Sequence, residues 1–191
     1  MKVLLRDPVY FIKNLYKIIK FKLKFNNSFI RDPLQIDYTS LNNIQISNKV
    51  FIDVKSTIRI MDECRLLIGE GTYIGPHCHL SGTKNNLIIG KGVLMGPRVY
   101  ISTTNYKYED ITIAIKNQGY VSKGDVIIGD GSWIGIGSCI LSGIKIGKNV
   151  VIGANSVVTK NIPSFSVAVG SPAKIVKQYN EKEKKWVTRL D

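Results

Sequence analysis

The chain has 191 residues, of which 44% are hydrophobic and 21% charged, a composition typical of a folded globular protein and not of a disordered one. Its formal net charge is +13, and the first 31 residues hold eight Lys or Arg against one acid, which argues against a nucleic-acid groove spread over the domain. No apolar run reaches the roughly 18 residues of a membrane span, no signal peptide is recognisable, and three cysteines without metal-ligand spacing indicate free thiols. We therefore expect a cytoplasmic protein of one domain with small appendages.

The first predicted element is a helix over residues 8–25, with Pro8 suited to its first turn. Its spacing places five apolar residues near one face and four lysines elsewhere: Phe11, Leu15, Ile18, Ile19 and Leu23; Lys13, Lys17, Lys20 and Lys24. Two interpretations remain open. The helix either caps the domain and exposes a solvated basic face, or makes peripheral contact with an anionic membrane surface, at the inner membrane face.

A six-residue repeat dominates the rest of the chain. An aliphatic residue, often followed by glycine, opens each hexad at positions 46, 52, 58, 68, 74, 80, 89, 95, 101, 128, 134, 140, 146, 152 and 158. This period fits neither an amphipathic helix nor a hairpin ladder, but it fits a chain wound as a three-sided coil with one hexad per side. The opening residues would point inward and stack between turns, while the small residue after each permits a tight corner. The sequence therefore predicts an all-β fold, a parallel β-helix of hexapeptide repeats.

The repeat also sets the expected boundaries. Residues 1–44 would form a basic N-terminal helical or extended segment, residues 45–173 the β-helix, and residues 174–191 a C-terminal helix or tail. One long interruption, over residues 102–127, brings in the polar stretch that begins as STTNYKYED. An excursion from a rigid scaffold is where function is usually located, so we expect an active-site loop here.

Several motifs follow this interruption: WIG at 133–135, GANSVVTK at 153–160 and GSPAK at 170–174. On these motifs the chain resembles the hexapeptide-repeat acyltransferases, in particular the maltose, galactoside and polysaccharide O-acetyltransferase branch. The resemblance implies a left-handed β-helix and a homotrimer with active sites between neighbouring subunits. It also implies acetyl-CoA as co-substrate, a sugar or glycan acceptor, and no metal.

The same resemblance implies a set of cofactor-binding residues. The backbone at Ile136 and Ala154 matches positions that hydrogen-bond the pantetheine arm. Four further residues match positions near the cofactor phosphates, where ammonium groups attract negative charge: Thr159, Lys160, Lys174 and Lys177. Trp133 matches a position near the site, and a purely structural packing role for it is equally open.

The catalytic base is where the sequence departs from the family. Relatives carry a histidine on the excursion loop, whereas this chain has Tyr106, preceded by the candidate substrate-binding residue Asn105. A tyrosine has an ordinary pKa near 10, so its use as a base at neutral pH costs on the order of 4 kcal/mol unless that pKa is depressed. Tyr106 is therefore a candidate catalytic residue whose ordinary pKa is unfavourable for a base.

The only two histidines of the sequence, His77 and His79, lie in IGPHCHLSG. Three interpretations compete: His79 replaces the missing base, the pair contacts the acceptor, or both are surface residues of a coil. Two histidines are too few for a three-histidine zinc site of the carbonic-anhydrase kind.

These observations predict an acetyl-CoA-dependent O-acetyltransferase that acts on a sugar hydroxyl, in the biosynthesis of a surface polysaccharide such as capsule or lipopolysaccharide. Two alternatives remain. Because of Tyr106, the chain could be a catalytically impaired trimer with a binding or structural role. It could also transfer the acyl group to another acceptor, such as the amine of a nucleotide sugar or an antibiotic.

Overall fold

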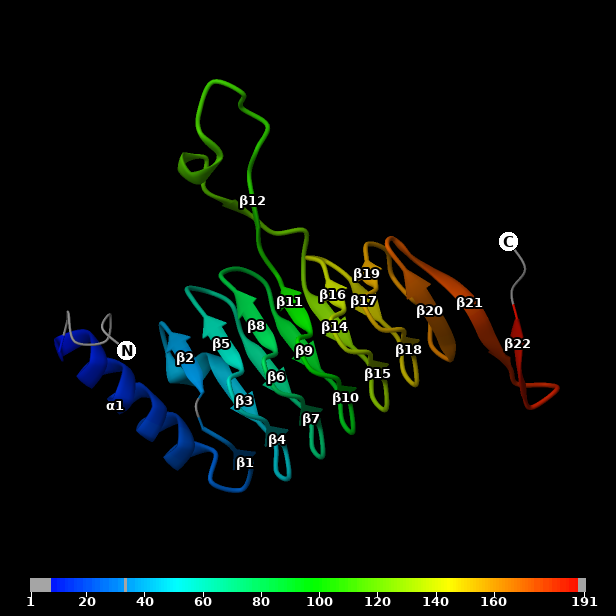
Figure 1. The fold of residues 1–191 in the computed structure, drawn as a ribbon, viewed down its shortest axis with the longest axis horizontal. Helices are drawn as coiled ribbons and strands as arrows, with labels where there is room; N and C mark the ends of the chain where they lie inside the picture. The colour runs from blue at the N-terminus through cyan, green and yellow to red at the C-terminus, as the bar shows by residue number, and fades with distance from the viewer. Residues whose placement is uncertain (1–7, 33, 189–191) are drawn as a thin grey trace.

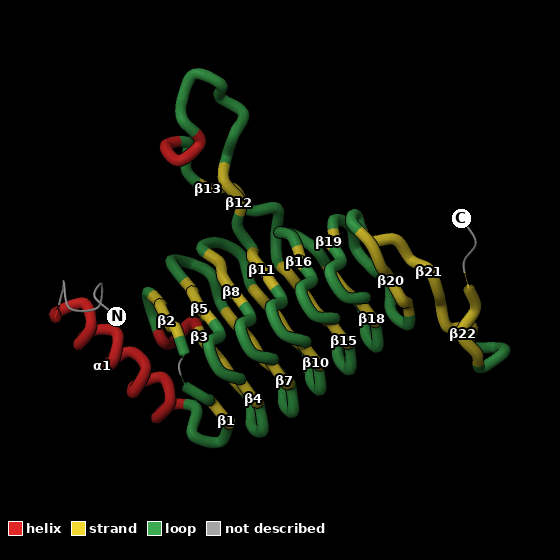
Figure 2. The backbone as a smooth tube through the Cα atoms, in the orientation of Figure 1, coloured by secondary structure: helices red, strands yellow, loops and turns green. Residues whose placement is uncertain are grey.

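The computed structural model describes residues 8–32 and 34–188, and these form one elongated coil with a helix at one end (Figure 1). The helix is α1 (Pro8–Lys24). Successive turns of the coil lie beside one another along its long axis, and one loop stands away from the coil near its middle (Figures 1 and 2).

Each full turn contributes a strand to each of three sheets, and the strands of successive turns run parallel. Sheet A contains, in spatial order, β1 (Phe29–Ile30), β4 (Phe51–Ile52), β7 (Tyr73–Ile74), β10 (Leu94–Met95), β15 (Trp133–Ile134), β18 (Val151–Ile152) and β20 (Ser166–Gly170). Sheet B contains β2 (Gln35–Tyr38), β5 (Thr57–Ile60), β8 (His79–Gly82), β11 (Tyr100–Ser102), β16 (Cys139–Ile140) and β19 (Val157–Val158). Sheet C contains β3 (Ile44–Ile46), β6 (Leu66–Ile68), β9 (Leu87–Ile89), β14 (Val126–Ile128) and β17 (Lys145–Ile146).

The core is a set of inward columns in which one turn stacks on the next. In sheet A the column is in strict register: Ile52, Ile74, Met95, Ile134, Ile152 and Ala168, all buried. Backbone bonds join the turns, as where Gly135 N–H donates to the Ile152 carbonyl at 2.8 Å. A Cβ at Gly135 would lie 2.7 Å from the backbone nitrogen of Ala154, so this corner excludes a side chain. The predicted β-helix and its hexad phase are confirmed.

Helix α1 closes the N-terminal end of the coil, but not with the face that the sequence suggested. Phe21 and Phe25 are buried against the first turn, with Ile18 packed at their edge. Leu15, Ile19 and Leu23, predicted to share the packed face with Ile18, are exposed; the side chain of Phe11 lies outside the described residues. The two phenylalanines are larger and nearer the first turn, and this tertiary packing determines the buried face.

Lysines of α1 also form hydrogen bonds with the first turn, at the N-terminal end of the coil. The Lys17 ammonium group donates to the carboxylate of Asp37 at 2.6 Å and to the carbonyl of Tyr38 at 3.2 Å, and Lys24 donates to the carbonyl of Leu41 at 2.8 Å. These bonds satisfy polar groups of the first turn that face no preceding turn.

The two ends of the coil differ from the predicted boundaries. The first turn already begins at β1 and β2, which pair in parallel with β4 and β5, so it lies within the segment assigned to residues 1–44. The C-terminal segment is not a helix: β21 (Ala173–Asn180) pairs antiparallel with β20, and β22 (Lys185–Thr188) pairs with β21. Pairing with the last turn overrides the helix propensity of its lysines and glutamates.

The cysteines are free thiols, as predicted; burial raises the pKa of Cys64 and of Cys78 to about 11, which makes both poor nucleophiles. Among the described residues, no helix combines the length and the apolarity that are needed to cross a bilayer.

Truncation of one inward residue tests the stacking. Ile134→Ala should lower the free energy of unfolding by about 2–5 kcal/mol, because it opens a cavity between two turns. Ile111→Ala, at a side chain that is 97% exposed on the loop, is the matched control and should change it by less than about 0.5 kcal/mol. Equal effects in denaturant titrations would contradict the stacked core.

Candidate active site

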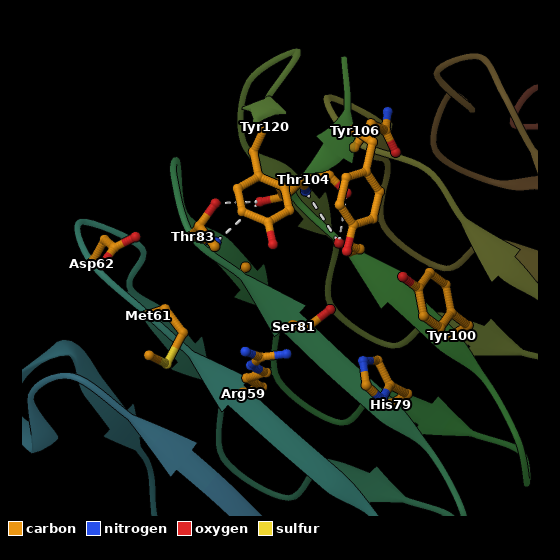
Figure 3. Close-up of a pocket in the computed structure, with 13 residues that line it drawn as sticks. Arg59, Met61, Asp62, His79, Ser81, Thr83, Tyr100, Thr104, Tyr106 and Tyr120 are labelled. Atoms are coloured by element: carbon orange, nitrogen blue, oxygen red, sulfur yellow. Dashed lines mark hydrogen bonds between the residues drawn. The ribbon is translucent and has the colours of Figure 1, made fainter. Parts of the chain in front are cut away.

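An open pocket of about 290 Å³ lies on the outer face of sheet B, beneath the excursion loop (Figure 3). This volume is near the lower end of the range for small-molecule sites, roughly 300–1,000 Å³. Residues of β5, β8 and β11 form its floor, and loop residues form one wall: Arg59, Met61, Asp62, His79, Ser81, Gly82, Thr83, Tyr100, Ser102, Thr104, Asn105, Tyr106 and Tyr120. The predicted residues His79, Asn105 and Tyr106 thus come together in one pocket.

The parallel register of sheet B aligns the floor. His79 pairs with Tyr100 on the next turn, and their rings stack at 5.1 Å between centroids with an angle of 10°. Two positions further along the strands, Arg59 is in register with Ser81. Because alternate residues of a strand face outward, this register places an imidazole, a guanidinium, a hydroxyl and a phenol on one surface.

The environment keeps His79 neutral at physiological pH. Burial lowers the pKa of the imidazole below its ordinary value of 6.5, and the positive charge of Arg59 lowers it further. A neutral imidazole can accept a proton, so His79 is available as a general base.

The loop leaves the coil after β11 and returns at β14, and its base is a short antiparallel ladder of β12 (Asn105–Tyr106) and β13 (Tyr120–Val121). The Gln118 side chain holds the middle of the loop, since its Nε2 donates to the carbonyls of Asp110 and Ile113 at 2.7 and 2.8 Å. A 3₁₀ turn, η2 (Ile115–Asn117), precedes it. The loop is therefore an ordered excursion that fixes the position of Tyr106.

Tyr106 lies beside Tyr120, with ring centroids 4.9 Å apart. A side-chain hydrogen bond with Tyr120, and then the charge of that second phenol, raise the pKa of Tyr106 above its ordinary value of 10. The shift opposes ionisation, so this environment makes Tyr106 a weaker base than a free tyrosine. A protonated phenol instead donates a hydrogen bond or packs against a ligand.

The other predicted residues lie elsewhere on the protomer. His77 occupies the turn before β8 and is exposed, outside the residues that line the pocket. Trp133 lies on sheet A, in register with Leu94. Ile136 and Ala154 lie on consecutive turns at the corner where sheet A passes into sheet B; Thr159, Lys160, Lys174 and Lys177 follow toward the C-terminal end, all exposed.

Two of the cofactor-binding candidates, Ile136 and Ala154, lie at the edge of sheet B opposite to the loop, whereas Thr159 and Lys160 follow the end of β19, at the same edge as the loop. Ile136 precedes β16, at the edge where sheet B strands begin, whereas the loop leaves from the end of the parallel strand β11. Within the described chain, the backbone at Ile136 and Ala154 is therefore separated from the loop by the width of sheet B.

Among the lining residues that sequence reasoning did not single out, three have large polar side chains: Arg59, Tyr100 and Tyr120. A signal existed for the first two, since the hexad phase places both at outward positions on turns adjacent to His79. Tyr120 gave no such signal, because its position depends on how the loop folds back.

Comparisons with known proteins agree with the observed fold. Residues 125–160 match the family described as bacterial transferase hexapeptide (six repeats). This chain carries the hexapeptide repeat of that transferase family. Its resemblance to the hexapeptide-repeat acyltransferases, stated from the sequence, is thereby confirmed.

Two curated relatives align along most of the chain. A protein of Mycobacterium tuberculosis named a probable acetyltransferase is 34% identical over 89% of this chain, and the galactoside O-acetyltransferase of Escherichia coli is 28% identical over 84%. The chain spans only 58% and 65% of the lengths of these relatives.

Solved structures share the fold. A maltose O-acetyltransferase from Clostridium difficile is 28% identical, with a TM-score of 0.55, and the match covers 89% of this chain and 88% of that one. AntD, an N-acyltransferase from Bacillus cereus, is 22% identical with a TM-score of 0.71, covering 88% and 90%. The latter likeness concerns the fold alone.

Within the described residues, no group of three or more His, Cys, Asp or Glu side chains could hold a metal ion.

The protonation of His79 can be measured directly. In a His77→Gln variant one imidazole remains, and its NMR titration should give a pKa below 6.5. Arg59→Gln should raise that value, because a positive charge is removed, but burial should keep it lowered. A pKa at or above 6.5 in the His77→Gln variant would contradict the assigned environment.

Proposed function

We propose that the protein transfers an acetyl group from acetyl-CoA to the hydroxyl of a sugar. The observation that carries the proposal is the pocket in which a hexapeptide coil places a neutral imidazole, His79, beside an ordered loop. The names of the galactoside and maltose O-acetyltransferases support a sugar acceptor and an oxygen nucleophile. We further propose a cytoplasmic role in the biosynthesis of a surface polysaccharide.

His79 is the proposed base. It takes the proton of the acceptor hydroxyl, whose oxygen then attacks the thioester carbon and forms the new C–O bond. The C–S bond breaks, and the thiolate leaves and takes up a proton. Tyr106 keeps its own proton, and its proposed role is a hydrogen bond to the acceptor.

The proposed acetyl-CoA site follows the corner between sheets A and B. Within the described residues, the N–H groups of Ile136 and Ala154 are not among the donors of the hydrogen-bond ladder, which leaves them for the amides of a pantetheine arm. Lys174 and Lys177 on β21, and Lys160 after β19, are exposed and give the C-terminal end of the coil a positive charge suited to phosphates.

A homotrimer would unite the two parts of the site. Because the loop and the corner lie at opposite edges of sheet B, the loop of one subunit could face the corner of its neighbour. Sheet A carries an outward column of apolar side chains suited to burial between subunits: Phe29, Phe51, Tyr73, Leu94 and Trp133. We assign Trp133 to that interface.

Turnover assays separate this proposal from the impaired-scaffold alternative. With acetyl-CoA and sugar acceptors, thiol release by His79→Ala should fall about 10²–10⁴-fold, while Tyr106→Phe should stay within about tenfold of the wild type. kcat/KM should rise with pH as His79 loses its proton, with an apparent pKa below 6.5, and then level off.

A rate that rises beyond pH 10 instead would identify Tyr106 as the base. His77→Ala should behave as the wild type. No turnover with any acceptor despite acetyl-CoA binding, together with a large gain in Tyr106→His, would support the impaired scaffold. Faster transfer to amino sugars than to hydroxyl sugars would show that the acceptor is an amine and not a hydroxyl.

Binding of coenzyme A tests the proposed cofactor-binding lysines without catalysis. Calorimetry should show weaker binding by about tenfold or more in a Lys160→Glu, Lys177→Glu variant, because two attractive charges become repulsive. The matched control is Lys91→Glu, an exposed lysine at the corner between sheets C and A, which should bind normally. Absence of binding in the unmodified protein would refute the enzyme proposal.

A further inference from the structure

Helix α1 has two apolar faces, and only one of them is used by the fold. Phe21 is 0% exposed against the first turn of the coil. On the opposite side, apolar side chains spaced four, three and four residues apart form a continuous stripe, the outer stripe: Ile12, Tyr16, Ile19 and Leu23, with Leu15 at its edge. Three of these side chains are more than half exposed, at 64% for Ile12, 62% for Tyr16 and 72% for Leu23. The capping role therefore leaves this stripe unexplained.

The charge that α1 itself carries is of one sign, although its Lys22 is paired with Asp32 beside the helix. The segment Pro8–Lys24 contains lysines but not a single Asp or Glu. Lys17 and Lys24 are engaged with the first turn, whereas Lys13 and Lys20 flank the outer stripe, and Lys20 lies over the Tyr16 ring, its Nζ 5.8 Å from the centroid. An apolar stripe bordered by lysines matches the surface of a bilayer with anionic headgroups.

We propose that α1 docks the protein onto an anionic membrane surface through the outer stripe. The helix would lie in the plane of the interface, with Ile12, Ile19 and Leu23 among the upper acyl chains. Lys13 and Lys20 would contact phosphate groups. A second copy of the chain is a poor occupant, because two such helices would bring like charges together.

The position of α1 beside sheet B determines how far the pocket would lie from a docked helix. The helix packs beside β2, the edge strand of sheet B, and β2 pairs with β5, which supplies Arg59 to the pocket. A docked helix would therefore hold the pocket within about two strand spacings, roughly 10 Å, of the first turn of the coil. If the chain forms a trimer of side-by-side coils, three helices would lie at one end and bind together.

Vesicle flotation with the full chain tests the proposal. The protein should float with phosphatidylcholine vesicles that contain 30% phosphatidylglycerol, a fraction of about one third chosen to give a strong surface charge, and much less with phosphatidylcholine alone. Binding should weaken as salt rises. Ile19→Glu with Leu23→Glu should reduce binding by about a hundredfold or more. Lys13→Glu with Lys20→Glu should reduce it by about twentyfold or more.

Matched controls use the same substitutions elsewhere. Ile111→Glu with Ile113→Glu alters two exposed loop residues, and Lys91→Glu with Lys116→Glu alters two exposed lysines outside α1. Both controls should bind vesicles as the unmodified protein does. All variants should keep its thermal unfolding, because the altered side chains are exposed or half-exposed.

Three results would overturn the proposal. The first is failure of the unmodified protein to float with anionic vesicles. The second is equal loss of binding in the helix variants and in the loop control. The third is a change of molar mass in light scattering, without lipid, for Ile19→Glu with Leu23→Glu, which would assign the outer stripe to contact between copies. None of these readouts involves catalysis, so they are independent of the acetyltransferase proposal.

Discussion

The structure depends on the vertical stacking of inward aliphatic residues between parallel turns. Each turn alone buries little, and Ile74, Met95, Ile134 and Ile152 become a core only because backbone bonds hold successive turns in register. The same register aligns outward positions, so His79 stacks on Tyr100 and Arg59 lies beside Ser81. The register between turns that builds the core therefore also aligns the floor of the pocket.

The loop shows what such a scaffold tolerates. Between β11 and β14 the chain leaves the coil and returns without disturbing the stack, since Ile101 and Ile128 remain fully buried on either side. Its own bonds, through Gln118 and Asp110, keep it ordered. The rigid coil can therefore carry a polar excursion, and the mechanism that we propose depends on the contrast between a neutral His79 and a protonated Tyr106.

The features that the sequence could predict are those that depend on residues close together in the chain. The hexad phase gave the coil and its inward residues, because each position repeats the same environment. The first turn was missed, since around Phe29 and Leu34 the aliphatic residues lack the glycine that marks later corners. The C-terminal strands and the buried face of α1 depend on neighbours distant in sequence. For the site, motif matching placed Tyr106 in the loop, but the lowered pKa of His79 comes from burial and then from Arg59, and the raised pKa of Tyr106 comes from Tyr120, whose position depends on how the loop folds back.

The two ends of the coil also bear on whether the protein polymerises. A stack of parallel strands exposes an unpaired edge at each end, and such edges can add further turns from another molecule and grow into a fibre. At the N-terminal end, Lys17 and Lys24 occupy carbonyls of the first turn, and Phe21 and Phe25 fill its apolar surface. At the other end the antiparallel β21 reverses the strand direction that a further parallel turn would require. Helix α1 and the antiparallel strand β21 therefore oppose the addition of further turns at the two ends of the coil, and damage to either would favour end-to-end polymerisation.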